Sequence, residues 1–487
     1  MSGEIFSEFL RDKSAGEVFA WLIAPISLEQ FFSEYWQKKP LLIKRKDREY
    51  YKQFLTRKAI VRQLKSDEGL RNEIDLNVAR YVDGEQIMET GPKNQRADAK
   101  HALQRFKQGS SWQAVHPQRY HGPTAELLSK IEAALGCVCG SNSFITPENS
   151  RGFKPHHDEV EVFMLQLEGS KHWRLHQGDK QLPTTYKWDY PKSIVKEKPI
   201  LETDLDAGDL LYFPRGTVHY ATAGKHGFSH HLTVSTYQKN TWGDLLLKAM
   251  PKAIEKAMES DVKFREGLPI RWLRFAGENV DIPQTHGSDG STGDKLKQMM
   301  HQLVDHMDFD NLADVMAAKF VASRLPPVQS GESKSESADV RPGKDLIRWT
   351  DPLAVRVVVD ESPDGGLETQ IYHSFQNDPS KHLDPGVAEP SPECFVLPGD
   401  DHAPALFKLF NDWPSWQQIP ESASDEFVEL LSGLRENGLV ESRCGKKELV
   451  ADCPLDTLAR SGIAQKRKCS GAPQSKKKKK KKSPVSA

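Results

Sequence analysis

The stretch F-K-P-H-H-D-E-V-E-V-F, residues 153–163, carries two histidines and two acids at a spacing suited to metal binding. Two ligand pairs are possible, His156 with Asp158 and His157 with Glu159. Residues two apart in a strand point to the same side, so either pair could share a metal ion. The triplet alone is weak evidence, because 17 histidines and 68 acids in 487 residues produce about two such triplets by chance.

Two further triplets of this kind occur, His306-Met307-Asp308 and His382-Leu383-Asp384. The first falls in an expected helix and the second in an expected loop. Neither has a third ligand or a strand to present it, so we expect no metal at either position.

A third ligand for the first site has a candidate in His219, which ends the stretch L-Y-F-P-R-G-T-V-H after a Gly-Asp turn and a strand. Two histidines and one carboxylate form the facial triad that holds Fe(II) and leaves positions open for a co-substrate and O₂. The alternative is a surface loop histidine with no such role. Spacing alone leaves both interpretations open.

Lys171 begins a return strand after the turn at Gly169-Ser170, one hairpin beyond Asp158. An inward lysine in a small barrel is costly unless it meets an anion. The distal carboxylate of 2-oxoglutarate would be such an anion. An outward surface lysine is equally compatible with the spacing.

The elements that must position these residues are strands separated by short turns. Between about 140 and 240 the strand-like segments are S-F-I-T, V-E-V-F-M-L-Q-L, K-H-W-R-L-H, D-L-L-Y-F-P and H-L-T-V-S-T-Y. This succession predicts a barrel or sandwich rather than an alternating α/β fold. Upstream, residues 15–60 show helical spacing, and residues 75–84 alternate and end in Asp83-Gly84, a hairpin signal.

The C-terminal half changes character at Trp242, where a helical period begins and continues to about residue 325, with a polar break at 287–294. Residues 329–339 are rich in Ser, Glu and Lys and are typical of a flexible linker. The strands and the helix that follow are compatible with a winged-helix module. Its helix is acidic, which favours a packing or protein-contact role over nucleic-acid readout.

Composition places the chain among globular proteins of two or three domains. No apolar run approaches the roughly 18 residues of a membrane helix, and the first residues lack the layout of a signal peptide. Six cysteines without a disulfide framework indicate a reducing, intracellular setting. Among them, Cys137 and Cys139 are expected to be small buried residues rather than zinc ligands.

The net charge of −1 conceals an asymmetry between the body and the tail. Residues 465–487 contain ten Lys and Arg and no acid, so the rest of the chain carries −11. An acidic body attracts basic partners. The lysine tail predicts a nuclear or nucleolar address, with non-specific RNA contact or a disordered passenger as alternatives.

Four segments together resemble the JmjC-type ribosomal oxygenases. They are N-S-F-I-T-P, P-H-H-D-E-V-E-V-F-M-L-Q-L-E-G-S-K-H-W-R-L, G-D-L-L-Y-F-P-R-G-T-V-H and H-L-T-V-S-T-Y-Q-K-N-T-W-G-D. The resemblance spans about residues 15–450. Within the family, F-F-S-E-Y-W-Q-K-K-P-L-L-I, K-H-W-R-L and F-R-E-G-L-P favour the ribosomal oxygenase 2 branch.

The resemblance implies an α+β fold with three parts. These are a double-stranded β-helix (jelly-roll, cupin-like JmjC) catalytic domain, a helical dimerisation domain and a C-terminal winged-helix domain. The expected divisions are 1–115 for N-terminal elements completing the catalytic domain, 116–249 for the JmjC core, 250–328 for the dimerisation domain, 329–343 for the linker, 344–460 for the winged-helix-like domain and 461–487 for a disordered basic tail.

The resemblance also implies Fe(II)- and 2-oxoglutarate-dependent hydroxylation of a histidine β-carbon in a large-subunit ribosomal protein. The family's site positions fall on seven residues: iron ligands His156, Asp158 and His219, co-substrate contacts Lys171 and Asn142, and substrate contacts Ser235 and Asn77. One departure is Phe144, where the family usually has a tyrosine, which puts one hydroxyl contact in doubt.

Strand parity separates the two overlapping pairs. With His156 and Asp158 inward, the interior is lined by Val160, Val162, Met164 and Gln166. The other frame would turn Glu159 and Glu161 inward and bury a second acid without a partner. We therefore expect His157 and Glu159 to face away from the metal.

Two alternative functions remain. The first is a histone lysine demethylase acting on methylated histone H3, although the sequence has no Cys/His zinc cluster of a chromatin reader. The second is a non-catalytic cupin-fold scaffold, which would not need the triad and Lys171 together. The expected partners are a ribosomal-protein peptide and a second copy of the chain, with a histone as the alternative and neither a membrane nor sequence-specific nucleic-acid binding. The expected location is the nucleus and nucleolus.

Overall fold

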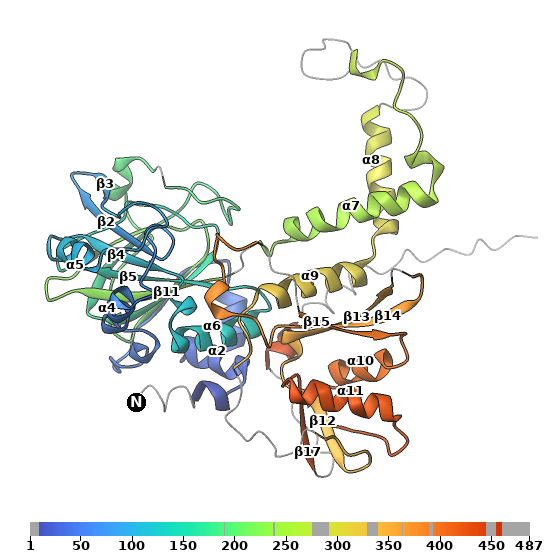
Figure 1. Cartoon of the computed structure of the whole chain (residues 1–487). Coiled ribbons are helices and arrows are strands. Elements are labelled where there is room, and N and C mark those ends of the chain that lie inside the picture. Colours follow the sequence, from blue (N-terminus) through green and yellow to red (C-terminus); the bar gives the residue numbers. More distant parts are fainter. Residues whose placement is uncertain are drawn as a thin grey trace, which may run out of the picture.

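The computed structural model describes residues 9–188, 190–236, 239–274, 292–328, 339–362, 364–388, 393–444 and 454–459. A β-rich body, a helical arm and a C-terminal module follow one another along the chain (Figure 1). The expected basic tail and most of the expected linker lie outside the described residues, as does most of the polar break at 287–294.

Two antiparallel sheets form the body. The larger has the order β1-β9-β6-β11-β5-β4-β2-β3 and the smaller the order β10-β7-β8. Their strands are β1 (Leu41–Ile43), β2 (Leu76–Val82), β3 (Glu85–Met88), β4 (Ser111–Val115), β5 (Gly140–Thr146), β6 (Glu161–Glu168), β7 (Ser170–His176), β8 (Leu201–Asp206), β9 (Leu210–Phe213), β10 (Val218–Ala223) and β11 (Ser229–Thr236). This is the jelly-roll architecture that the strand pattern and the resemblance predict.

Strand β6 of the larger sheet is buried on both faces, which explains its continuous apolar run. Val162 and Met164 pack toward the smaller sheet, against its Trp173. Phe163 and Leu165 alternate with them and face the helices. The two faces of one strand thus serve two different cores.

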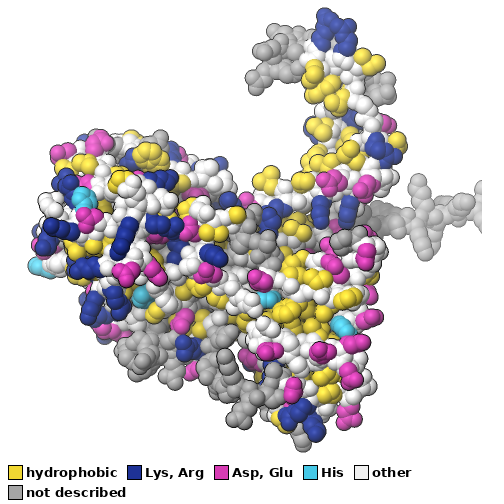
Figure 2. Space-filling model, in the orientation of Figure 1, with side chains coloured by type: hydrophobic (Ala, Val, Ile, Leu, Met, Phe, Trp, Pro, Cys, Tyr) yellow, Lys and Arg dark blue, Asp and Glu magenta, His cyan; other side chains and the backbone are white. Residues whose placement is uncertain are grey.

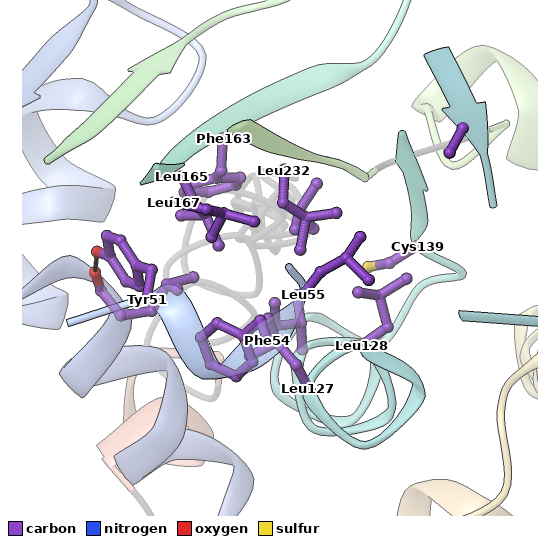
Figure 3. Packing of buried hydrophobic residues seen from close by; sticks show 14 of the residues in the cluster. Tyr51, Phe54, Leu55, Leu127, Leu128, Cys139, Phe163, Leu165, Leu167 and Leu232 are labelled. Atoms are coloured by element: carbon purple, nitrogen blue, oxygen red, sulfur yellow. Dashed lines mark hydrogen bonds between the residues drawn. The ribbon is translucent and has the colours of Figure 1, made fainter. Parts of the chain in front are cut away.

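The N-terminal helices cover the outer face of the larger sheet. They are α2 (Ala15–Ile23), α3 (Leu28–Gln30), η1 (Phe31–Tyr35), η2 (Lys52–Phe54), α4 (Arg57–Lys65), α5 (Ala99–Lys107), η3 (Pro117–Arg119) and α6 (Gly122–Leu135). Figure 3 shows Leu127 and Leu128 of α6 and Phe54 close to Leu165 and Leu232 of the sheet. Each fully buried leucine of this kind contributes about 1.5–3 kcal/mol to folding.

The Asp83-Gly84 pair forms the predicted hairpin between β2 and β3. Both residues have positive φ, 53° and 83°, as a type I′ turn requires. The resulting hairpin forms one edge of the larger sheet. At the other edge, β1 from the K-P-L-L-I stretch pairs with β9.

The arm consists of α7 (Trp242–Ser260), α8 (Thr292–Leu303) and α9 (Phe309–Ser323), with the short turns η5 (Val262–Phe264), η6 (Trp272–Arg274) and η7 (Val304–His306). Thr241 and Asp244 form a capping box that starts α7 where the helical period begins in the sequence. In Figure 1, α7 and α8 project away from the body, and α9 runs back along the C-terminal module. No helix in the described part of the chain is long and apolar enough to span a bilayer.

The C-terminal module contains two three-stranded sheets and two helices. Its elements are β12 (Asp345–Trp349), η8 (Pro352–Ala354), β13 (Val355–Glu361), β14 (Leu367–His373), η9 (Pro379–Lys381), β15 (Glu393–Pro398), α10 (Ala403–Asn411), β16 (Gln417–Gln418), α11 (Asp425–Glu436) and β17 (Val440–Cys444). Helix α11 ends at Glu436, and Gly438 takes the left-handed φ of 79° that leads into β17.

Candidate active site

His156, Asp158 and His219 lie together, with one ligand atom from each within 4.8 Å of the others. The Nε2 atom of His219 is 3.7 Å from Oδ2 of Asp158, and the two imidazole centroids are 4.3 Å apart. The structure therefore brings together the three residues that the sequence singles out.

Backbone pairing places the two histidines. His156 N donates to His219 O at 3.3 Å, and His219 N donates to His156 O at 2.9 Å. Gly216 N also donates to Asp158 O at 2.9 Å. Gly216 has φ 86°, and a Cβ there would lie 2.5 Å from Cδ of Pro183, so only glycine fits this turn.

The strand expected from His156 begins later, at Glu161. His156 and His157 form isolated bridges with His219 and Lys187 instead of joining the β6 ladder. The two-residue alternation still holds across these bridges, because each pairs to a different side. Asp158 lies between these bridges and the start of β6 at Glu161, and its carbonyl is held by Gly216 N.

Each metal-facing imidazole has its Nδ1 occupied. Nδ1 of His156 bonds to Lys154 O at 2.9 Å, and Nδ1 of His219 bonds to Thr217 O at 3.1 Å. A carbonyl oxygen only accepts hydrogen bonds, so Nδ1 carries the proton of each ring. The lone pair of Nε2 is therefore free to bind a metal ion. Burial, helped by His156, lowers the pKa of His219 to about 4, which keeps that ring neutral.

The second pair faces away, as the parity argument predicts. His157 bonds through Nδ1 to Tyr190 Oη at 2.6 Å and through Nε2 to Thr185 O at 3.2 Å, and Glu159 is exposed. Glu161, expected to be unpartnered if turned inward, is instead fully buried on the helix-facing side.

Tyr212 Oη donates to the Glu161 carboxylate at 2.8 Å, and Arg215 lies 3.7 Å away. Burial nevertheless raises the pKa of Glu161.

The triad opens into a cavity of about 430 Å³, which could accept a small dicarboxylate together with a substrate side chain. Its inner lining is mixed polar and aromatic: Asn77, Gln113, Asn142, Phe144, Met164, Lys171, Trp173, His231 and Thr233. Its mouth is rimmed by Met88, Tyr186 and Trp188, with the Lys154 ammonium 3.5 Å above the Trp188 ring.

Lys171 points into this cavity rather than out to solvent, and it is 6% exposed. Its Nζ donates to Thr146 Oγ1 at 3.2 Å. Within the described ranges no carboxylate lies at ion-pair distance from it. Burial, with a smaller effect of Arg151, lowers its pKa to about 7. An anion in the cavity would supply the missing countercharge.

The lining suits a divalent metal with an anionic co-substrate. Two imidazoles and a carboxylate form the donor set of the facial triad. Buried polar atoms around it without a hydrogen-bond partner include Asn142 Oδ1, Trp173 Nε1 and His231 Nδ1. Unpartnered buried groups are rare in folded proteins, so their gathering here indicates a place for a ligand.

Of the remaining expected site residues, the structure places some in the cavity lining and one outside it. Asn77 and Asn142 line the cavity, and Asn77 Nδ2 donates to Gln113 Oε1 at 3.0 Å. Ser235 lies on the same face of β11 as Thr233 but is not among the lining residues. Phe144 stacks on His231, with centroids 5.1 Å apart, so an apolar wall stands where a hydroxyl would be.

Sequence reasoning missed several lining or supporting residues, among them Gln113, Thr146 and His231. The alternation of β11 could have identified His231, because it shares the face of Thr233. No local sequence pattern marks Gln113 as a lining residue. It reaches the cavity because it lies opposite Asn77 in the pairing of β2 with β4. Cys137 and Cys139 are buried, as expected.

Comparison with known proteins gives a consistent result. Residues 113–245 match the JmjC domain. The chain is 35% identical to ribosomal oxygenase 1 of Danio rerio, over 88% of this chain and 80% of that protein. It is 32% identical to the bifunctional lysine-specific demethylase and histidyl-hydroxylase NO66 of Dictyostelium discoideum, over 88% and 82%. It is 35% identical to ribosomal oxygenase 2 of Mus musculus, over 76% and 79%, so overall identity does not separate the two branches.

Proposed function

Because the chain belongs to the ribosomal oxygenase family of JmjC-domain proteins, we propose that it hydroxylates a histidine side chain of a large-subunit ribosomal protein. It is a 2-oxoglutarate-dependent oxygenase with Fe(II) as its metal. The observation that carries the proposal is the meeting of the triad and the inward Lys171 in one cavity.

In this proposal Nε2 of His156, the Asp158 carboxylate and Nε2 of His219 hold the iron. Lys171 and Thr146 bind the distal carboxylate of 2-oxoglutarate. When bound, the iron and co-substrate activate O₂, giving succinate and CO₂ and placing one oxygen atom in a substrate C–H bond. The protein supplies orientation and exclusion of water.

The amide wall, defined as Asn77, Gln113 and Asn142, supports a histidine as target. A neutral imidazole has one nitrogen that donates a hydrogen bond and one that accepts. A side-chain amide can pair with both, because its oxygen accepts and its NH₂ group donates. Phe144 and Trp173 close the remaining sides with apolar surface, which keeps bulk water from the reacting carbon.

The charge of the body supports a basic peptide as substrate. The chain outside residues 465–487 carries −11, which favours encounter with a basic ribosomal protein. The lysine tail supports a nuclear and nucleolar location, where ribosomal proteins are assembled.

The arm supports a homodimer. Its helices expose a series of large apolar side chains: Trp242, Leu246, Leu247, Ile254, Met258, Leu296, Met300, Val304 and Phe309. Figure 2 shows hydrophobic side chains, in yellow, gathered along the projecting arm. Exposed apolar surface of this extent marks a protein interface. In a homodimer, the apolar side chains of one arm would pack against the same side chains of the second arm.

A second candidate is lysine demethylation of methylated histone H3. The observation that favours it is the name of the Dictyostelium relative, which combines a demethylase with a histidyl-hydroxylase. A non-catalytic scaffold is the third possibility and predicts no turnover at all.

The deciding experiment incubates the protein with ribosomal extract, Fe(II) and 2-oxoglutarate, and in parallel with trimethylated histone H3. We expect a gain of one oxygen on a ribosomal histidine that Asp158→Ala abolishes. The matched control is Glu159→Ala, an exposed acid one residue away, which should retain the activity. Loss of methyl groups without histidine oxidation would favour the second candidate. Absence of both products would favour the third possibility, a non-catalytic scaffold.

A further inference from the structure

The triplet His382-Leu383-Asp384, which has no metal-site context, is buried between the C-terminal module and the body. His382 is 5% exposed, and the Asp384 side chain is 8% exposed. Leu383 has a positive φ of 52°. This turn in the backbone lets the residues on both sides of it reach the body.

Asp384 completes a buried ion network on the body. Arg71 Nη2 donates to its carboxylate at 2.6 Å, and Arg119 Nη1 lies 3.4 Å from it. The same two arginines also hold Asp75, Arg71 Nε at 2.7 Å and Arg119 Nη2 at 3.0 Å. Two cations therefore meet two carboxylates, and the C-terminal module supplies one of the two. Removing it would leave a buried guanidinium short of countercharge.

His382 makes the second connection. Its Nδ1 lies 3.1 Å from Gln118 Nε2 and its Nε2 lies 3.0 Å from Glu132 Oε1. The Gln118 amide donates to Nδ1, so Nε2 carries a proton and donates it to Glu132. Glu132, which is fully buried, also accepts from Cys139 N at 2.9 Å. Gln118 in turn accepts from Ser141 Oγ at 2.6 Å.

We name this set the interdomain latch: His382 and Asp384 of the C-terminal module with Arg71, Asp75, Gln118, Arg119 and Glu132 of the body. The interdomain latch contacts the ends of three strands that are neighbours in the larger sheet, β2, β4 and β5. Asp75 precedes β2 and accepts from Val115 N of β4 at 2.9 Å. Ser141 lies in β5 and accepts through its carbonyl from His116 N at 2.9 Å.

The same three strands carry the amide wall. Asn77 follows Asp75 by two residues, and Asn142 follows Ser141 directly. Asn77 stands opposite Gln113, and Val115 stands opposite Asn142. A shift of any strand end would therefore move a cavity amide, while the iron ligands lie on other strands and loops.

We propose that His382 and Asp384 are positioning residues for the amide wall, so that the C-terminal module sets affinity for the substrate side chain without touching it. The inference rests on the proposed function for the identity of the substrate. Its physical basis is that displacement of a binding group by about 1 Å weakens orientation of the reacting side chain.

The test compares Asp384→Asn and His382→Gln with wild type, using Lys381→Gln as the matched control on the same loop, where the lysine is exposed. Steady-state kinetics would measure KM for a histidine-containing ribosomal peptide and KM for 2-oxoglutarate. We expect the peptide KM to rise about tenfold, corresponding to one charged hydrogen bond, and the 2-oxoglutarate KM to stay within about twofold. Asp384→Glu, which keeps the carboxylate, should recover part of the loss.

Hydrogen exchange provides a second measurement that needs no turnover. In the variants, exchange should rise in residues 74–78, 111–118 and 139–143 and stay unchanged in 156–158 and 217–221. A peptide KM equal to wild type together with unchanged exchange in the strands would overturn the proposal. So would a uniform rise of both KM values with faster exchange throughout the body, because that pattern describes loss of stability alone. If the wild-type protein hydroxylates no histidine, the exchange result decides the proposal by itself.

Discussion

His156 and His219, far apart in the chain, exchange both of their backbone hydrogen bonds, at 3.3 and 2.9 Å. The two imidazoles therefore emerge from one antiparallel bridge, already on the same side. The metal site is preorganised by the backbone, and ligand side chains need little rearrangement to bind an ion.

The overlapping pair H-H-D-E provides a paired test of this geometry. His156→Ala removes a ligand and should weaken Mn(II) binding, used as a stable substitute for Fe(II), by at least about 100-fold. His157→Ala should leave metal affinity within about threefold, because its ring bonds to Tyr190 and Thr185 instead. Isothermal titration calorimetry measures both. Equal losses in the two variants would contradict the assignment.

The pH dependence of co-substrate binding should follow Lys171. Burial lowers its pKa to about 7, so the ammonium that attracts the dicarboxylate is present below pH 7 and is lost as the pH rises through this value. Affinity for 2-oxoglutarate should therefore be highest near pH 6 and fall above pH 7, by up to about tenfold per pH unit. Calorimetry on the Mn(II)-loaded protein from pH 6 to 9 measures the profile.

Lys171→Arg is the control for that profile. A guanidinium stays charged across the whole range, so the variant should bind with a nearly flat pH dependence. A profile that keeps the wild-type midpoint in this variant would assign the titration to another group.

Tyr212 should matter for stability rather than for chemistry. Its hydroxyl donates to the buried Glu161 carboxylate at 2.8 Å and accepts from Gln37 N at 2.8 Å. Tyr212→Phe removes both hydrogen bonds, and the free energy of unfolding should fall by about 1–3 kcal/mol. Urea unfolding measures the loss. Tyr35→Phe, on the partly exposed surface of the same region, should change stability by less than about 0.5 kcal/mol.

The oligomeric state should depend on the apolar side of the arm. Leu247 is 75% exposed and Ile254 is 40% exposed on α7. The double substitution Leu247→Glu and Ile254→Glu should convert a dimer to a monomer in light scattering, with little effect on folding because both side chains already face solvent. Glu255→Ala on the same helix is the control. A dimer that survives the double substitution would place the interface elsewhere.

Local patterns in the sequence were enough to predict the hairpin at Asp83-Gly84 and to single out candidate metal ligands, whereas the full set of site residues was implied only by the family resemblance. The triad could be suggested because two of its members are close in sequence and the third follows a recognisable strand, β9, although spacing alone left the role of His219 open. The inward direction of Lys171 was not predictable from spacing, because it depends on which sheet encloses the strand. Confirmation came from its burial and its bond to Thr146.

What escaped prediction depends on contacts between distant segments. The helix-facing burial of Glu161 requires Tyr212, and the polar roles of His382 and Asp384 require Arg71 and Glu132. No local pattern distinguishes a buried ion pair of this kind from a surface loop. The functions of the lysine tail and the expected domain divisions stay predictions.

The position of β11 between β5 and β6 has a consequence for how the chain is made. On the ribosome, β5 and β6 emerge before residues 229–236, their shared neighbour, so neither can complete its pairing until that strand follows. A nascent chain ending at residue 228 would already contain His156, Asp158, Lys171 and His219 and still have no assembled site. Closure of the larger sheet is thus timed by β11, the last strand of the body, and the interval before it is when exposed strand edges most need a chaperone.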